Sequence, residues 1–415
     1  MNYNTHTLDS GLRIIHLPSS SPVVYCGYQI KAGSRCEEPG EEGLAHFCEH
    51  MTFKGTQRRR AWNILNSLES VGGDLNAYTN KEDTCYYAAI PKEHVARAID
   101  LLTDIVFHSV YPQAEINKEV EVICDEIESY NDSPAELIFD DFENLVFAHH
   151  PLGHNILGAA DNVRRFTTDD ALRFTRRYYR PDNAVFFVYG DVDFKRLVRK
   201  LEQLVPTPTL QQTSPPTHRP TNKPAHQQTN PPAHQPTIIE RGTHQAHVML
   251  GNEAYCVTDE RRMPLYVLNN MLGGPGMNAR LNLVLREHHG LVYTVESSMV
   301  SYGDTGLWCT YFGCDPHDVK RCLRLVRREL DRLMQAPITE TRLRAAKKQL
   351  KGQISVACDN HESFALSFGK SYLHYGWERH IDRLYAQIDR VTADDILRVA
   401  RHIFAPETMT TLIYR

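Results

Sequence analysis

The sequence predicts an α+β fold built from two related domains. A chain of 415 residues, of which 41% are hydrophobic, is long enough to form two or three hydrophobic cores. Strand-like and helix-like segments occur in groups without strict alternation, which favours an antiparallel sheet with helices packed on one face in each domain. Two similar segments, one near the end of each half, indicate that each half holds a copy of the same unit.

The repeated segments are TTDDALRFTRRYYRP, which ends at Pro181, and VTADDILRVARHIFAP, which ends at Pro406. The offset between them is 406 − 181 = 225 residues. In each copy the helical pattern opens with polar capping residues, stops at the proline and is followed by a strand pattern. The first-copy residues whose type recurs at this offset are Thr167, Asp169, Asp170, Leu172, Arg173, Arg176 and Pro181.

The remaining elements follow from local patterns. Runs of β-branched and aromatic residues predict strands at 12–18, 23–30 and 247–252. A turn at residue 72 leads into a further strand pattern that extends to residue 90. Helical spacing of apolar residues predicts helices at 43–55, 93–107, 114–132 and 318–334.

A proline-rich stretch separates the two halves. Residues 206–237 are rich in proline, glutamine and threonine and contain almost nothing large and apolar, so we expect an extended linker. The predicted organisation is an N-terminal domain at 1–205, the linker at 206–237, and a related C-terminal domain at 238–415.

Composition excludes several classes of function. Lysine and arginine number 46 against 51 acidic residues, and the net charge of −5 provides no general basic field for nucleic acid or an anionic membrane. No segment approaches the roughly 18 consecutive apolar residues of a membrane helix. The first residues lack a signal-peptide pattern, and ten scattered cysteines without a C-x-x-C pair fit reduced thiols. We therefore expect a cytoplasmic protein with neither nucleic-acid nor membrane partners.

One helix carries a metal-binding pattern. In residues 43–55, GLAHFCEHMTFKG, the side chains of His46, Glu49, His50 and Phe53 recur at i, i+3, i+4 and i+7 and share one face. Two imidazoles four residues apart can bind one ion, and the glutamate between them reaches a water on that ion. This order, H-x-x-E-H, is the reverse of H-E-x-x-H.

A second helix offers a third ligand. In residues 114–132, Glu119 and Glu126 lie two turns apart, beside an apolar stripe that we expect to be buried. A catalytic zinc takes three protein ligands and keeps one position open. One of the two carboxylates can complete the site, and the other can orient a ligand by a hydrogen bond.

These residues resemble a known family. HFCEH at 46–50, the MTFKGT that follows, and EVICDEIESYNDSP around Glu126 are similar to motifs of the pitrilysin or insulinase family of inverted-zincin metallopeptidases. The likeness is greatest to its short members, such as bacterial processing-type peptidases and the mitochondrial processing peptidase β subunit. It extends over nearly the whole chain, because GGDLNAYTNKEDTCYY and GGPGMNARLNLVLREHHGLVYTV also look like family blocks.

The resemblance implies a site and a reaction. It makes His46, His50 and Glu126 the ligands of one zinc ion per chain, Glu49 the general base and Glu119 the supporting acid. The implied reaction is hydrolysis of peptides or unfolded segments by a zinc-activated water. Because long relatives enclose their substrates with four such domains, the two domains here imply a dimer, expected to be a homodimer.

Further residues are candidates for substrate contact. Beside a peptidase site, residues 72–90 are expected to form an edge strand that pairs with an extended peptide through Asn76 and Ala77. In similar enzymes the aromatic that matches Phe53 lines the pocket for the residue after the cleaved bond. The resemblance makes Arg286 a residue that holds the substrate backbone and Tyr293 a donor to the oxyanion.

Two other classes of function remain as alternatives. A non-catalytic partner subunit of the same family typically lacks part of the zinc motif, whereas every member is present here. A structural zinc protein needs a fourth ligand, and helical spacing directs Cys48 away from the face of the histidines. The predicted function is therefore that of a zinc metalloendopeptidase.

Overall fold

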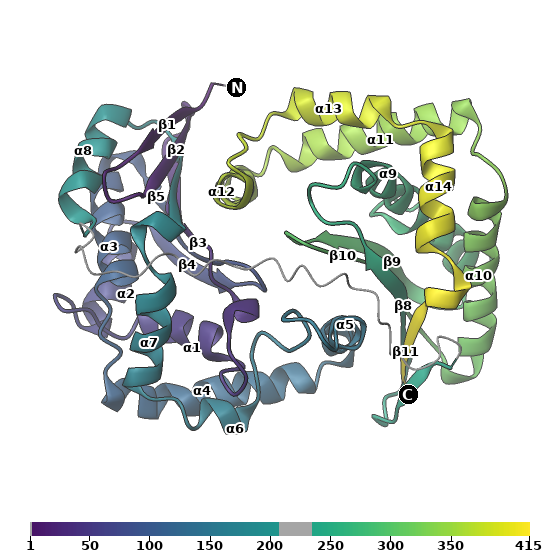
Figure 1. The fold of residues 1–415 in the computed structure, drawn as a ribbon, viewed down its shortest axis with the longest axis horizontal. Helices are drawn as coiled ribbons and strands as arrows, with labels where there is room; N and C mark the ends of the chain where they lie inside the picture. The colour runs from purple at the N-terminus through teal and green to yellow at the C-terminus, as the bar shows by residue number, and fades with distance from the viewer. Residues whose placement is uncertain (1, 207–234) are drawn as a thin grey trace. The chain divides into compact units, whose positions relative to one another are not determined.

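The computed structural model describes residues 2–206 and 235–415, so most of the expected linker lies outside the described residues (Figure 1). The described chain forms two compact units, each with its own β-sheet. In the described residues, the first unit contains 2–129, 150–206 and 357–380, and the second contains 130–149, 235–356 and 381–415.

The first unit is built on a six-stranded sheet of order β1-β2-β6-β3-β5-β4. All neighbouring strands run antiparallel except β2 and β6, which are parallel. Strand β4 lies at one edge, as the sequence predicts for the segment that contains Asn76 and Ala77. The strands are β1 Asn4–Thr7, β2 Arg13–Pro18, β3 Val23–Ile30, β4 Asp74–Thr79, β5 Thr84–Pro91 and β6 Ala184–Gly190.

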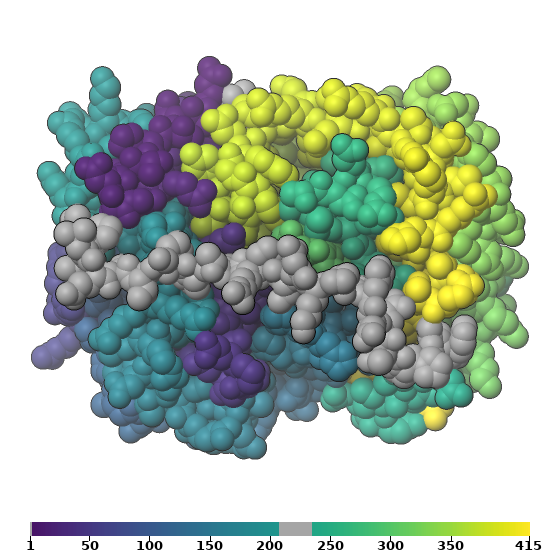
Figure 2. All heavy atoms as spheres, viewed as in Figure 1, coloured from purple at the N-terminus to yellow at the C-terminus, as the bar shows by residue number. Residues whose placement is uncertain are grey.

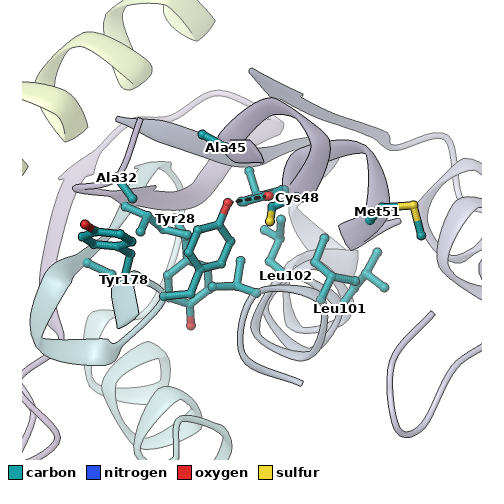
Figure 3. Close-up of a cluster of buried hydrophobic side chains, with 14 of the residues drawn as sticks. Tyr28, Ala32, Ala45, Cys48, Met51, Leu101, Leu102 and Tyr178 are labelled. Carbon is teal, nitrogen blue, oxygen red and sulfur yellow. Dashed lines mark hydrogen bonds between the residues drawn. The ribbon is translucent and has the colours of Figure 1, made fainter. Parts of the chain in front are cut away.

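A large hydrophobic core lies on one face of this sheet. Tyr28 of β3 is fully buried there, together with apolar residues of the surrounding helices. Figure 3 shows Cys48 and Met51 of α1 near Leu101 and Leu102 of α3 within this core. The helices of the unit's N-terminal part are α1 Leu44–Thr52, α2 Ala61–Glu69, α3 Val95–Phe107, α4 Gln113–Asn131, α6 Ala160–Val163, α7 Thr168–Tyr178 and α8 Phe194–Leu204.

A helix from the C-terminal half covers the other face of the same sheet. Helix α12 (His361–Tyr375) contacts β6 and β3, and Phe368 lies edge-on to Phe187, which points away from the Tyr28 face. Buried Asp83 binds this helix, because it forms ion pairs with two residues of α12, Lys370 at 2.6 Å and His374 at 3.3 Å. Burial alone would raise the pKa of Asp83, but these two partners outweigh it and lower the pKa to about 2.

The second unit repeats the arrangement with a five-stranded sheet of order β7-β11-β8-β10-β9. Strands β7 and β11 are parallel, and the other pairs are antiparallel. Trp308 of β10 packs against Phe404, just after α14, and α13 and α14 reach the unit's surface (Figure 2). The elements are β7 Thr237–Ile239, β8 Ala246–Ala254, β9 Val292–Ser301, β10 Gly306–Cys314, β11 Thr410–Tyr414, α9 Arg262–Gly273, α10 Val319–Gln335, α11 Glu340–Ala357, α13 Ile381–Arg390 and α14 Ala393–Ile403.

This sheet likewise receives a helix from the opposite half of the chain. Helix α5 (Pro134–Val146) contacts β8 and β11, and Tyr414 donates a hydrogen bond to Asp141 at 2.5 Å. Phe139 of α5 also packs against Tyr311, on the face of the sheet opposite to Trp308. Each unit therefore contains one helix from the other half.

The α+β class and the two related domains are confirmed, with differences in detail. Capping boxes open α7 at Thr167 and α14 at Thr392, as the repeat predicts. Each sheet contains one parallel pair, so neither is purely antiparallel. Helices cover both faces of each sheet, because α12 packs on the sheet of the first unit and α5 on the sheet of the second. A single boundary at the linker therefore does not separate the two units. No helix in the described residues is long and apolar enough to cross a membrane.

Candidate metal centre

The helix that bears the H-x-x-E-H motif is held at its N-terminus by a buried carboxylate. Gly43 precedes α1 with a φ of +100°, a conformation that favours glycine. The carboxylate of Glu37 accepts hydrogen bonds from the backbone N–H of Gly43 at 3.0 Å and of Ala45 at 2.7 Å. His154 lies 2.9 Å from the same carboxylate. Glu37 thus satisfies backbone donors that a helix N-terminus leaves free.

Helix α1 has two distinct faces. Cys48 is fully buried, with its Sγ 4.0 Å from the carbonyl oxygen of Ala171, so it points away from the histidines as expected. His46 and His50 lie on the other side, with ring centroids 4.6 Å apart. The local 3.6-residue period thus separates the packing residues of the helix from its polar ones.

Helix α4 supplies the two carboxylates that the sequence singles out. Ile116, Val120 and Ile123 are buried, which fixes the rotation of the helix about its axis. Glu119 is 8% exposed, and the side chain of Glu126 is 45% exposed. Both acids reach the histidines of α1, so α1 and α4 face each other at this point.

Three side chains form a cluster that fits a metal ion. Glu126 Oε2 lies 3.3 Å from His50 Nε2 and 3.8 Å from His46 Nε2, and all three ligand atoms lie within 4.8 Å of one another. Ligands of a tetrahedral zinc at about 2.0–2.2 Å are separated by roughly 3.3–3.6 Å. The cluster therefore needs only small side-chain movements to hold zinc.

Glu119 occupies the opposite side of one histidine. Its Oε1 lies 3.0 Å from His50 Nδ1, and Lys54 Nζ lies 2.6 Å from its Oε2. Because Glu119 meets Nδ1 whereas Glu126 meets Nε2, the two acids cannot exchange roles without a rotation of the ring. Glu119 is thus placed to orient His50, and the Lys54 ammonium balances its charge. By contrast, His46 Nδ1 is buried and has no hydrogen-bond partner among the described residues.

The two histidines differ in their electrostatics. Burial, followed by the charge of His50, lowers the pKa of His46 to about 4, although Glu126 acts in the opposite direction. Burial also disfavours a charge on His50, but the hydrogen bonds to Glu119 and Glu126 prevail and raise its pKa to about 9. In the metal-free protein the imidazolium of His50 thus lies between two carboxylates, and a metal at Nε2 would replace the proton that faces Glu126.

Glu49 lies on the same helix, between the two histidines in sequence. Its side chain accepts a hydrogen bond from the hydroxyl of Thr79 at 2.5 Å. Burial raises the pKa of the Glu49 carboxyl, whereas Thr79 and the charge of His50 oppose the increase. A carboxylate with a raised pKa, next to a possible metal site, is suited to accept and return a proton.

The expected substrate contacts differ in their surroundings. Asn76 is exposed, and its side chain donates to Asp74, whereas Ala77 packs against the core of the first unit. Phe53 is partly buried against the same core, with its ring 6.0 Å from that of Tyr86. The structure thus gives Phe53 a packing role, and its part in substrate binding stays a prediction.

Arg286 and Tyr293 belong to the second unit. Arg286 lies in the π-helix Asn282–Glu287, and Tyr293 lies at the start of β9 with 81% of its surface exposed. The chain turns between them at Gly290, whose φ is +59°, and the guanidinium lies 5.7 Å from the centre of the tyrosine ring. Both side chains are available to solvent, and their catalytic roles stay predictions.

Three residues that support the centre, Lys54, Thr79 and Glu37, were not predicted from the sequence. Lys54, which follows the end of α1, continues the four-residue spacing of His46 and His50, so its position could have been noticed. Thr79 and Glu37 carry no local signal, because their contacts with α1 arise from strand and loop packing.

Comparison with known proteins is consistent with this geometry. Residues 14–160 match the model of insulinase (peptidase family M16), and residues 165–350 match the model described as the peptidase M16 inactive domain. A zinc protease of Streptomyces coelicolor, described as uncharacterized, is 35% identical, covering 98% of this chain and 88% of that protein. Another, from Bacillus subtilis, is 32% identical and covers 98% and 97%.

Solved structures agree in fold. A protease from Helicobacter pylori superposes with a TM-score of 0.90 at 22% identity, covering 100% of this chain and 99% of that one. A peptidase M16 inactive domain from Pseudomonas fluorescens gives a TM-score of 0.85 at 18% identity, covering 100% and 98%. Sequence and fold together show that the chain belongs to the insulinase, or pitrilysin, family of peptidases, family M16, and to its short two-domain type.

Proposed function

We propose that this chain is a zinc-dependent metalloendopeptidase that cleaves peptides or unfolded protein segments. The observation that carries the proposal is the convergence of His46, His50 and Glu126 on one point, with Glu49 on the same helix. Curated relatives at 35% and 32% identity are named zinc proteases, which supports both the metal and the reaction class.

Each residue of the centre has a chemical role in this proposal. Bound zinc would supply a Lewis acid that polarises a carbonyl and lowers the pKa of a water. His46, His50 and Glu126 would hold it. Glu49 accepts the proton of the attacking water and then delivers it to the leaving amine. Glu119 and Lys54 hold His50 in the required orientation.

The free edge of β4 is the proposed site for the peptide backbone. Asn80 N–H donates to the carbonyl of Asp83 at 2.8 Å, which closes the hairpin between β4 and β5. In an antiparallel pair, hydrogen-bonded and non-hydrogen-bonded positions alternate along the strand. Counting back from Asn80, the backbone of Asn76 is bonded to β5, whereas the N–H and C=O of Ala77 and Thr79 face the free edge. Ala77, rather than Asn76, thus offers backbone groups to a peptide.

Replacing Ala77 with proline tests this edge. Proline removes the N–H that faces outward and leaves the β4–β5 ladder intact, so KM is expected to rise about 2- to 10-fold, the effect of one lost backbone hydrogen bond. Zinc content and thermal stability should stay near wild type. The matched control is Asn76→Pro, which removes a ladder hydrogen bond and should lower Tm. Unchanged KM in a folded Ala77→Pro protein would exclude backbone pairing at this residue.

Arg286 and Tyr293 belong to the second unit, and the proposal keeps for them the roles that the resemblance implies, in the same chain or in a partner copy. Tyr293 would donate to the oxyanion, and Arg286 would hold the substrate backbone. We propose a homodimer as the working assembly, with one zinc per chain.

A non-catalytic role within the family is the alternative. The match to an inactive domain covers residues 165–350, but the complete H-x-x-E-H motif lies in the part that matches the insulinase model. Among the described residues, His46, His50 and Glu126 form the only group of three or more that could hold a metal ion. One catalytic and one supporting domain per chain account for both matches.

Metal analysis combined with a peptide-cleavage assay distinguishes these roles. Purified protein should contain about one zinc per chain and should hydrolyse members of a quenched peptide library. Chelation should remove the activity, and added zinc should restore it. A fully loaded protein that cleaves no member of the library would support the non-catalytic alternative, and a protein that binds no zinc would refute the proposal.

A further inference from the structure

A single hydrogen bond connects the edge strand β4 to the candidate general base. The hydroxyl of Thr79, the last residue of β4, lies 2.5 Å from Glu49 Oε2 on α1. Among the described residues no other side-chain hydrogen bond to Glu49 is found. Glu49 is only 9% exposed, so this contact is sheltered from competing water. The position of the carboxylate therefore depends strongly on Thr79.

The direction of this hydrogen bond is set by the carboxylate, and the neighbouring hydroxyl of Thr84 cannot replace the donor. An ionised carboxylate only accepts hydrogen bonds, so Thr79 must donate. Thr84 Oγ1, at 3.4 Å, is a second but more distant acceptor for the Thr79 proton. Thr84 is fully buried, and its own proton is directed to the carbonyl oxygen of Ala32 at 2.8 Å. Thr84 thus cannot donate to Glu49 in place of Thr79.

Because of this contact, the two carboxylate oxygens of Glu49 have different roles. Oε2 of Glu49 is engaged by Thr79, and Oε1 remains free to accept a proton from water. A glutamate side chain has three rotatable bonds, and a charge-assisted hydrogen bond at its end limits their freedom. Holding a base in a productive orientation contributes to rate because the reacting atoms must be closely placed.

We propose that Thr79 is a positioning residue that holds the carboxylate of Glu49 ready for proton transfer. This inference rests on the proposed peptidase function. Because the backbone of Thr79 also faces the free edge of β4, the residue that holds the base belongs to the strand that receives the peptide. Peptide pairing along this edge would thereby order Thr79 and, through it, the base.

Three variants test the role of the hydroxyl. Thr79→Val keeps the shape of the side chain but removes the donor, and it should lower kcat roughly 10- to 100-fold, the range for a lost hydrogen bond to a charged group. KM should change less than about 2-fold, and zinc content should stay at one per chain. Thr79→Ser restores the hydroxyl and should recover most of kcat. The matched control Thr84→Val makes the same change 3.4 Å away and should lower Tm without lowering kcat.

Crystal structures of the zinc-free proteins provide a readout that does not depend on activity. Glu49 should occupy one position in the wild-type and Thr79→Ser proteins and should be displaced or disordered in Thr79→Val. Unchanged kcat and an unmoved Glu49 in Thr79→Val would overturn the proposal, as would equal losses of kcat in Thr79→Val and Thr84→Val. If the zinc-loaded wild type itself is inactive, the proposed function fails, and the position of Glu49 still decides whether Thr79 holds it.

Discussion

Glu49→Gln is expected to abolish peptide hydrolysis while leaving zinc bound. Glutamine has the shape of glutamate and can still accept the hydrogen bond from Thr79, but it cannot take a proton from water. Loss of a general base costs about a hundredfold or more in rate. Glu49 is not among the three residues that converge on the metal position, so zinc content should remain at one per chain.

The measurement is kcat for a cleaved peptide, together with zinc content and Tm. The structure explains why folding should survive this change, because Glu49 lies on the polar side of α1 and the core residues lie on the other. Activity within about twofold of wild type, at full zinc occupancy, would remove Glu49 from the mechanism. Loss of zinc together with activity would instead mean that Glu49 is a ligand.

The core of the site could be predicted from sequence because its geometry is local. His46, Glu49 and His50 share a face of one helix, and Glu126 is placed by the apolar stripe of another. The spacing alone left the roles of Glu119 and Glu126 open. The structure supplies the distinction, since one acid meets Nδ1 of His50 and the other meets Nε2.

Contacts between distant segments could not be predicted in this way. A threonine in a strand has no sequence pattern that identifies its partner, so the contact of Thr79 with Glu49 became visible only in the folded chain. The spacing of Lys54 is visible in the sequence, but its contact with Glu119 is not. For the same reason, the sequence does not reveal that α5 and α12 each belong to the unit formed mainly by the other half of the chain. The buried residues of α12 lie on one face of the helix, but their spacing does not specify which sheet the helix covers. That choice depends on the ion pairs of Asp83 and on packing against Phe187.

Glu126→Gln is expected to lose zinc almost completely, whereas Glu119→Gln should weaken zinc binding by only about 10- to 100-fold. Among the described residues, Glu126 is the one carboxylate within reach of both Nε2 atoms, and an amide oxygen is a much poorer zinc ligand than a carboxylate. Glu119 touches His50 from the far side of the ring, so its loss relaxes the orientation of the ligand without removing one.

Zinc affinity measured by competition with a chromogenic chelator distinguishes the two variants, and peptide hydrolysis should fall in parallel. Both proteins should stay folded. The Glu126 side chain is 45% exposed, and the Lys54 side chain, 26% exposed, can turn to water when Glu119 is neutralised. The matched control is Glu121→Gln, the same change on α4 at a side chain that is 67% exposed and forms an ion pair with Arg164 at 3.7 Å. A greater loss of zinc in Glu119→Gln than in Glu126→Gln would mean that the His50 ring is reversed when metal binds, with Nδ1 as the ligand atom and Glu119 beside the ion.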